Sequence, residues 1–142
     1  MGDDAAAAAR IELAEATAAF VGLREYRRFD EIVDHVESIV TDEWWSDTFP
    51  AAPIDVEVQR RSRNATYSAA VDLGPGAAII LIVDGRAWDL ATVLHELAHV
   101  AAGPSADHGP EFELALLELW RRHAGIDAWA ALDRELHDAG QG

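Results

Sequence analysis

The segment 88–101 limits the possible folds most strongly, because it carries two histidines within a pattern that must bury one face of a helix. Its apolar residues recur at the spacing of one helical face. They are Leu90, Val93, Leu94, Leu97, Ala98 and Ala101. Gly103 and Pro104 end the predicted helix. Because residues four positions apart lie one turn above each other, His95 and His99 can bind the same metal ion.

Glu96 stands between these histidines in the sequence His-Glu-Leu-Ala-His. It is rotated by about 100° from His95 around the helix, so its carboxylate lies beside the metal ion rather than beneath it. There it can take a proton from a water molecule on the metal. Zinc suits such a site because it binds imidazole well and, with three protein ligands, keeps a position open for water. The pattern predicts a catalytic site with one Zn²⁺ ion; surface or capping histidines with a structural role are the alternative.

His108 is the favoured third ligand, because the glycines and proline of the segment 103–109 turn the chain back toward the metal helix. Under a second interpretation, Asp107 or His108 only caps the helix that follows. A glutamate on that following helix is a third possibility, and the candidates are Glu111 and Glu118. Both glutamates fit a solvated helix face better than a metal site.

Strand-like patterns precede the metal helix. In the segment 54–58 apolar and polar residues alternate, and the segment 67–73 repeats this pattern with Tyr67, Ala69, Val71 and Leu73 on one face. The residues 61–65 between them are few enough for a hairpin loop. The segment 77–83 is apolar throughout, which predicts a strand covered on both faces.

Helical patterns occupy most of the remaining chain. Four further helices are predicted, over 4–20, from 30 to about 45, from 110 to 125, and a short one from 127. The first begins after a cap at Asp3 or Asp4, and residues 1–10 are the part most prone to fray. Its apolar face is predicted to contain Ile11, Leu13, Ala14, Thr17 and Ala18. The whole chain, residues 1–142, therefore reads as a single α+β domain with a small sheet of three or slightly more strands, packed with helices around a central metal helix.

Composition excludes several classes of function. The chain has no cysteine, so any metal must be bound by histidines and carboxylates. Its formal net charge of −15 repels phosphate backbones, and we expect no direct nucleic-acid partner. The N-terminal residues lack the positive flank of a secretory signal, and no stretch approaches about 18 uninterrupted apolar residues. We therefore expect a cytoplasmic protein that does not bind membranes.

Two segments resemble a known family. Residues 94–99, Leu-His-Glu-Leu-Ala-His, and residues 107–112, Asp-His-Gly-Pro-Glu-Phe, are similar to the paired motifs of the SprT-like zincin metallopeptidases, especially a small actinobacterial group of metallohydrolases. The resemblance implies a zincin-like fold whose edge strand lies beside the cleft. It also implies that His95, His99 and His108 bind zinc and that Glu96 is the catalytic acid and base. DNA-directed proteolysis is not carried over, because this chain lacks a Cys-rich zinc ribbon and is strongly acidic.

Hydrolysis of an amide bond in a peptide or protein is the function that these residues predict. Zinc polarises the carbonyl and activates water, while Glu96 transfers the proton to the leaving amine. The competing class is a non-catalytic module, stabilised by zinc, that binds another protein. Glu96 argues for catalysis, because a structural site needs ligands but no general base.

Three other expectations concern residues around the motif. A carboxylate is expected to orient a ligand imidazole, and the candidates are Asp72, Asp84 and Asp107. Trp88 is interpreted as a packing residue rather than part of the cleft. His123, near the end of a predicted helix, is interpreted as a cationic cap.

Overall fold

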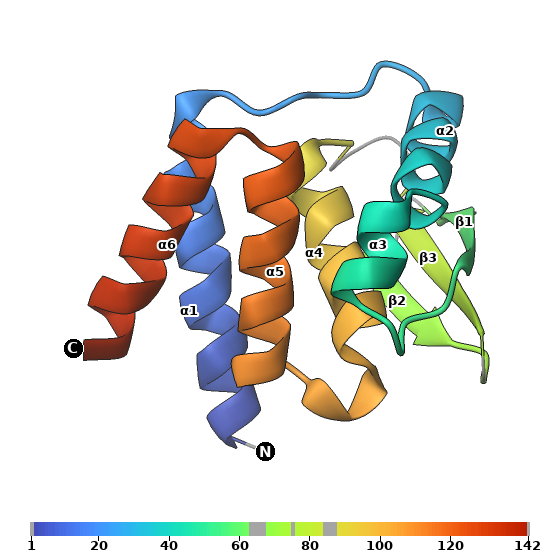
Figure 1. Cartoon of the computed structure of the whole chain (residues 1–142). Coiled ribbons are helices and arrows are strands. Elements are labelled where there is room, and N and C mark those ends of the chain that lie inside the picture. The colour runs from blue at the N-terminus through green and yellow to red at the C-terminus, as the bar shows by residue number, and fades with distance from the viewer. Residues whose placement is uncertain (1, 63–67, 75, 84–87, 142) are drawn as a thin grey trace.

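The computed structural model describes residues 2–62, 68–74, 76–83 and 88–141. This part of the chain contains six α-helices, two short 3₁₀ turns and one three-stranded sheet (Figure 1). The helices are α1 (Gly2–Ala18), α2 (Phe29–Val40), α3 (Glu43–Thr48), α4 (Leu90–Ala102), α5 (Pro110–His123) and α6 (Ile126–Gln141). The strands are β1 (Asp55–Arg61), β2 (Ala69–Asp72) and β3 (Ala77–Val83). The predicted α+β class is confirmed.

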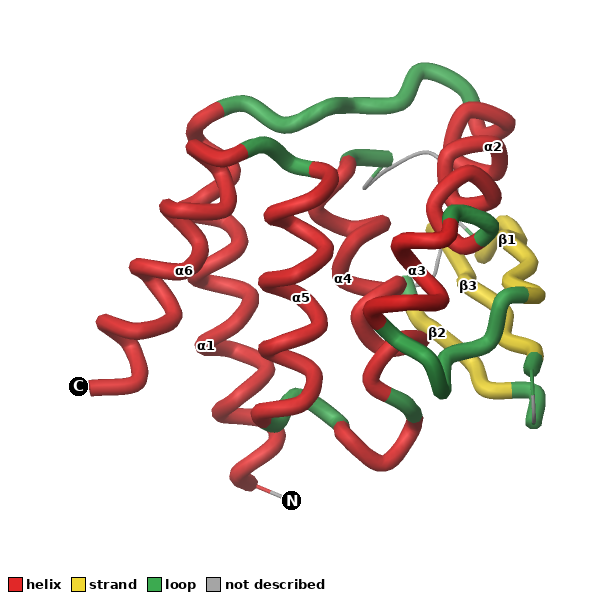
Figure 2. Tube along the Cα trace, in the orientation of Figure 1, coloured by secondary structure: helices red, strands yellow, loops and turns green. Residues whose placement is uncertain are grey.

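Helix α4 occupies the centre of the molecule. It contacts α5 on one side and strands β2 and β3 on the other, while α1 packs against α6 and α5 contacts α6. Figure 2 shows the three strands at one side of the molecule and α1, α5 and α6 at the other. The side chains of Val93, Leu94, Leu97 and Ala98 on α4 are all fully buried. The metal motif therefore lies on a helix that is held from several directions.

The strand order is β1-β3-β2, so the predicted hairpin between the first two strands is wrong. Strand β1 pairs in parallel with β3, from Asp55 opposite Ala77 to Arg61 opposite Val83. Parallel neighbours cannot be joined by a tight turn, and the chain instead passes through β2 before it returns as β3. The hairpin joins β2 to β3, which are antiparallel. Part of the predicted loop, residues 63–65, lies outside the described residues, as does Tyr67.

Strand β3 has the predicted bounds but one well-covered face. Ala78, Ile80 and Ile82 are buried in the core, whereas the alternating residues Ala77, Ile79 and Leu81 are only half-buried. The expectation that both faces are covered is therefore wrong. The apolar sequence is explained by one buried face and a central position between two other strands.

Two predicted helices differ in extent. The helix expected from residue 30 to 45 is interrupted after Val40, and α3 begins anew after Asp42, whose side chain accepts a hydrogen bond from the Trp44 amide. An aspartate in this position caps a new helix more readily than it continues an old one. The last helix is not short, because α6 runs for 16 residues.

Helix α1 is attached to its neighbours by contacts of residues 10–18. It begins at Gly2, so the two aspartates expected to cap it lie within the helix. Ile11, Ala14 and Ala18 are buried, but Leu13 is 70% exposed and Thr17 is also exposed, which corrects the assignment of both to the apolar face. Arg10 donates a hydrogen bond to the Leu136 carbonyl on α6 and forms an ion pair with Glu113 on α5. These contacts fix α1 against both neighbouring helices.

Helix α4 begins and ends where local chemistry directs it. The Asp89 side chain accepts a hydrogen bond from the Thr92 amide at 2.8 Å and caps its N-terminus. Gly103, with φ of 92°, ends it. Trp88 precedes the helix rather than belonging to it. Among the described residues, no helix is long and apolar enough to cross a membrane.

Candidate metal centre

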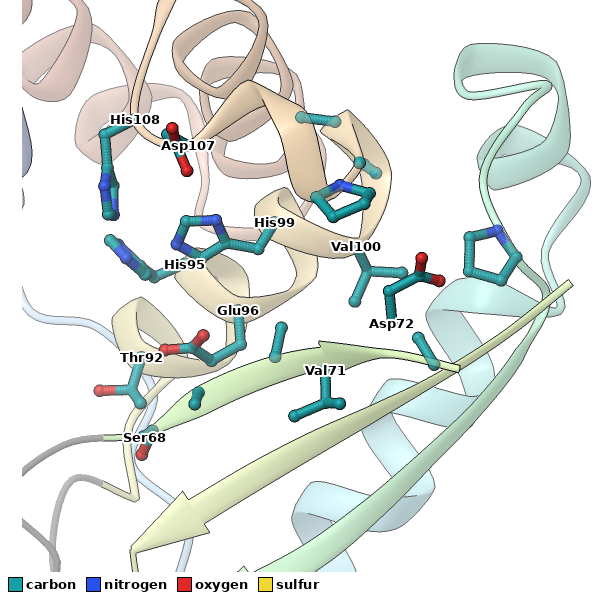
Figure 3. A pocket seen from close by; sticks show the side chains of 18 of the residues that line it. Ser68, Val71, Asp72, Thr92, His95, Glu96, His99, Val100, Asp107 and His108 are labelled. Atoms are coloured by element: carbon teal, nitrogen blue, oxygen red, sulfur yellow. The ribbon is translucent and has the colours of Figure 1, made fainter. Parts of the chain in front are cut away.

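Three histidines meet at the C-terminal half of α4. One ring nitrogen from each of His95, His99 and His108 lies within 4.8 Å of those from the other two. The ring centroids are 5.0 Å apart for His95 and His99, 5.5 Å for His95 and His108, and 4.7 Å for His99 and His108. Figure 3 shows the three imidazoles facing one another. This cluster could hold a metal ion, whereas the alternative ligands Glu111 and Glu118 are exposed on α5 and lie outside it.

The turn between α4 and α5 brings His108 back to the first two histidines. After Gly103 the chain makes a 3₁₀ turn over Pro104–Ala106, and the Gly109 amide then bonds to the Ala106 carbonyl at 2.9 Å. A Cβ atom on Gly109 would lie 3.1 Å from that carbonyl oxygen, so a side chain there would require the carbonyl to shift by a few tenths of an ångström. His108 is therefore placed by a compact turn rather than by a helix.

Phe112 forms the apolar support of the cluster. Its ring is fully buried, and its centroid lies 5.0, 4.4 and 5.0 Å from those of His95, His99 and His108. One aromatic side chain thus restricts the rings of all three histidines. Phe112 belongs to the motif 107–112, but the motif alone does not predict this supporting role.

The carboxylates that contact the ligand imidazoles come from α1. Both carboxylate oxygens of Glu15 lie 3.0 Å from Nδ1 of His95, and an oxygen of Asp4 lies 3.4 Å from Nδ1 of His108. The candidates named from the sequence are not these residues. Asp72 instead accepts a hydrogen bond from the Gly74 amide, and Asp84 lies outside the described residues. One feature of the sequence could have indicated Glu15 as such a carboxylate. It is an acidic residue on the face of α1 that also buries Ile11, Ala14 and Ala18.

Glu96 faces a cleft that the three histidines also line. The cleft has a volume of about 1130 Å³ and lies between α4, α1 and strand β2. Figure 3 shows the Glu96 side chain in this cleft, on the β2 side of the imidazoles. The residue is only 5% exposed. Burial raises the pKa of Glu96 to about 7; the charge of Glu15 adds to this effect, while His95 and Arg61 oppose it.

The protonation of His99 suits nitrogen ligation. Burial, together with the nearby His95 and His108, lowers the pKa of His99 to about 3, so its imidazole is neutral at neutral pH. Burial alone would lower the pKa of His95, but the hydrogen bond and the charge of Glu15 outweigh it and raise that pKa. The Glu15 carboxylate can only accept, so Nδ1 of His95 carries the proton and Nε2 is left with a free lone pair once the ring is neutral.

The other histidines and Trp88 lie elsewhere. Trp88 packs against the core and donates its indole hydrogen to the Val83 carbonyl, which agrees with the packing interpretation. His123 does not act as a cationic cap. Its ring packs edge-on against Trp44, and burial, with the charges of His35 and Arg122, lowers its pKa to about 4.

Comparisons of the chain with family models, with curated proteins and with solved structures found no match in any of the three. A functional interpretation therefore depends on the residues of the site, on their distances and burial, and on the chemistry that these permit.

Proposed function

We propose that this protein is a zinc-dependent hydrolase, and specifically a metallopeptidase that cleaves an amide bond. One observation carries the proposal: the buried carboxylate of Glu96 lines the same cleft as three converging histidines. Metal ligands alone would serve a structural site. A buried carboxylic acid beside them supports a site that moves protons.

The donor set fits zinc. Three imidazole nitrogens and no thiolate are available, since the chain has no cysteine. Zinc binds imidazole well, and three protein ligands leave its fourth position open to water or substrate. A zinc ion bound there would supply Lewis acidity and make water a nucleophile at neutral pH.

Glu96 would then perform the proton transfers. As a carboxylate it accepts a proton from the attacking water, and as a carboxylic acid it delivers that proton to the leaving amine. Its buried position excludes bulk water from competing for the proton.

The edge of the sheet supports a peptide substrate. Among the described residues, strand β2 pairs with β3 alone, and residues 68–72 line the cleft. An extended peptide can add to such an edge through main-chain hydrogen bonds. No arginine is found among the described residues that line the cleft, whereas Asp72 and Asp107 are. Peptides without acidic residues next to the cleaved bond are therefore the expected substrates.

Zinc content and cleavage of a peptide library test the proposal in wild type, Glu96→Gln and His108→Ala. Wild type and Glu96→Gln should each hold about one zinc ion, and only wild type should cleave. His108→Ala should bind zinc more weakly and lose cleavage. Glu118→Gln, which removes a carboxylate from an exposed position on α5, serves as the control and should behave as wild type.

Two outcomes contradict the proposal. Equal cleavage by wild type and Glu96→Gln would exclude Glu96 as the general base. Full zinc binding by wild type without any cleavage would favour the non-catalytic module that binds another protein.

A further inference from the structure

Helix α1 carries the two carboxylates that contact the ligand histidines, although it is remote from them in sequence. We infer that α1 completes the metal centre, and that Glu15 and Asp4 are positioning residues that fix the imidazoles of His95 and His108. This inference rests on the metal site of the proposed function. It does not depend on whether that site is catalytic.

The contact between Glu15 and His95 is buried, and both carboxylate oxygens take part in it. Each carboxylate oxygen lies 3.0 Å from Nδ1, and the two side chains are only 10% and 15% exposed. A carboxylate at a buried helix position costs free energy unless it is paired. Here the pairing holds the ring by its Nδ1 hydrogen, which directs Nε2 of His95 toward the other two histidines.

Asp4 holds His108 at two points. Its Oδ1 accepts a hydrogen bond from the His108 amide at 2.9 Å, and its Oδ2 lies 3.4 Å from Nδ1 of the same residue. His108 is the one ligand of the three outside a helix. A side chain that binds both its backbone and its ring therefore contributes orientation that the turn alone does not give.

The attachment of α1 does not depend on these two carboxylates. Arg10 is bound to α5 and α6, and Ile11, Ala14 and Ala18 are buried against the neighbouring helices. Removing the charge of Glu15 or Asp4 should therefore leave α1 docked. This independence makes the two contacts testable without unfolding the helix.

Zinc affinity, measured by competition with a chromogenic chelator, tests the inference in Glu15→Gln and Asp4→Asn. We expect Glu15→Gln to bind zinc about 10- to 100-fold more weakly, the range usual for such outer contacts. Asp4→Asn should lose less, because the amide oxygen of Asn still accepts from the His108 amide. Glu12→Gln is the control for charge, since Glu12 is an exposed residue of the same helix that lines the cleft and acts on His95 through its charge but without a hydrogen bond; it should lose less affinity than Glu15→Gln.

The absorption spectrum of the cobalt-substituted protein provides a second readout. It reports ligand geometry, so Glu15→Gln should change the band shape while Glu12→Gln should not. Glu15→Asp keeps the charge but shortens the side chain, and it should also weaken binding. Circular dichroism of the metal-free variants verifies that they remain helical.

Wild-type affinity and spectrum in Glu15→Gln and Glu15→Asp would overturn the inference. An equal loss of affinity in Glu12→Gln would also overturn it, since long-range charge would then explain the effect. If wild type bound no zinc, both this inference and the proposed function would fail. A different result would separate the two proposals. If wild type bound zinc but cleaved no peptide, and Glu15→Gln bound zinc more weakly than wild type, the positioning role would stand and the proposed hydrolase activity would fail.

Discussion

Asp107 is the one non-glycine residue with a positive φ among those the structure describes, with φ of 48° and ψ of −125°. For a residue with a Cβ this conformation costs on the order of 1–3 kcal/mol. It lies directly before His108, so the strain is stored where the chain must turn toward the metal site. The surrounding contacts, including the hydrogen bond that the His108 amide donates to Asp4, maintain it.

Replacing Asp107 by glycine should relieve this strain, whereas replacing it by valine should increase it. Both substitutions remove the same carboxylate, so a comparison of the two isolates the backbone effect. Glycine adopts the conformation freely, and we expect Asp107→Gly to unfold at or above the wild-type temperature and to keep zinc affinity. We expect Asp107→Val to lose stability and zinc affinity together. Thermal unfolding and zinc titration measure this, and equal behaviour of the two variants would contradict it.

His123 makes the fold sensitive to acid. Its Nε2 is buried without a hydrogen-bond partner among the described residues, and its pKa falls from 6.5 to about 4 on folding, mainly through burial. The folded state therefore takes up the proton less readily than the unfolded chain. The stability that results is complete above pH 6.5 and is lost as the pH falls from 6.5 through about 4.

The variant His123→Phe should remove this part of the acid sensitivity, because phenylalanine fills a similar space and does not titrate. Urea unfolding of the metal-free protein at about pH 7 and about pH 5 measures it. The free energy of unfolding should fall less between these values in His123→Phe than in wild type. His137→Gln is the control. His137 is exposed, and the Asp133 carbonyl and charge raise its pKa rather than lower it, so this substitution should not reduce the acid sensitivity. A drop in His123→Phe as large as in wild type would count against this explanation.

At the scale of elements, local patterns predicted the helices better than the sheet. The bounds of α4 and α5 followed from apolar spacing, from Gly103 and from Pro110, all of which act within a few residues. Strand pairing is decided by distant residues. Alternation marks β1 and β2 as strands but does not say that β3 lies between them. The predicted hairpin failed for this reason.

In the candidate site, too, residues with a local sequence signal could be predicted and residues from distant parts of the chain could not. His95 and His99 could be predicted as a pair because their spacing is that of one helix turn. His108 could be predicted from the turn that precedes α5. Glu15 is 80 positions from His95, and no local pattern states which helix will lie beside α4. A charged residue on an otherwise apolar face is the available signal, and it points to a buried partner without naming it.

The attachment of α1 can be tested through Arg10. Its guanidinium joins α1 to the Leu136 carbonyl and to Glu113, with both charged side chains about one-quarter exposed. Because solvent screens part of this interaction, we expect Arg10→Met to cost about 1 kcal/mol. In Arg10→Met, hydrogen exchange should show that α1 opens faster than α4. Arg134→Met, at an exposed position of α6, is the control and should change neither quantity.

At the scale of the whole molecule, the proposed metal centre draws on three parts of the fold. Helix α4 and the turn before α5 supply its ligands, while α1 supplies the carboxylates that touch them. A ligand that binds the folded state stabilises every element that its site needs. Zinc should therefore stabilise the α1–α6 pair as well as the motif, although α6 contributes no ligand.

Added zinc should raise the temperature of thermal unfolding, and chelation should reverse the change. With free zinc at about 100 times the dissociation constant, the folded state gains about 2.7 kcal/mol, or roughly 8 to 10 °C for a domain of this size. Glu96→Gln should show the same shift, since Glu96 is not a ligand, and His99→Ala should show almost none. Differential scanning calorimetry at fixed protein concentration measures this. A full shift in His99→Ala would mean that zinc acts elsewhere on this acidic surface, whereas its loss in His99→Ala together with its retention in Glu96→Gln would separate ligand from general base.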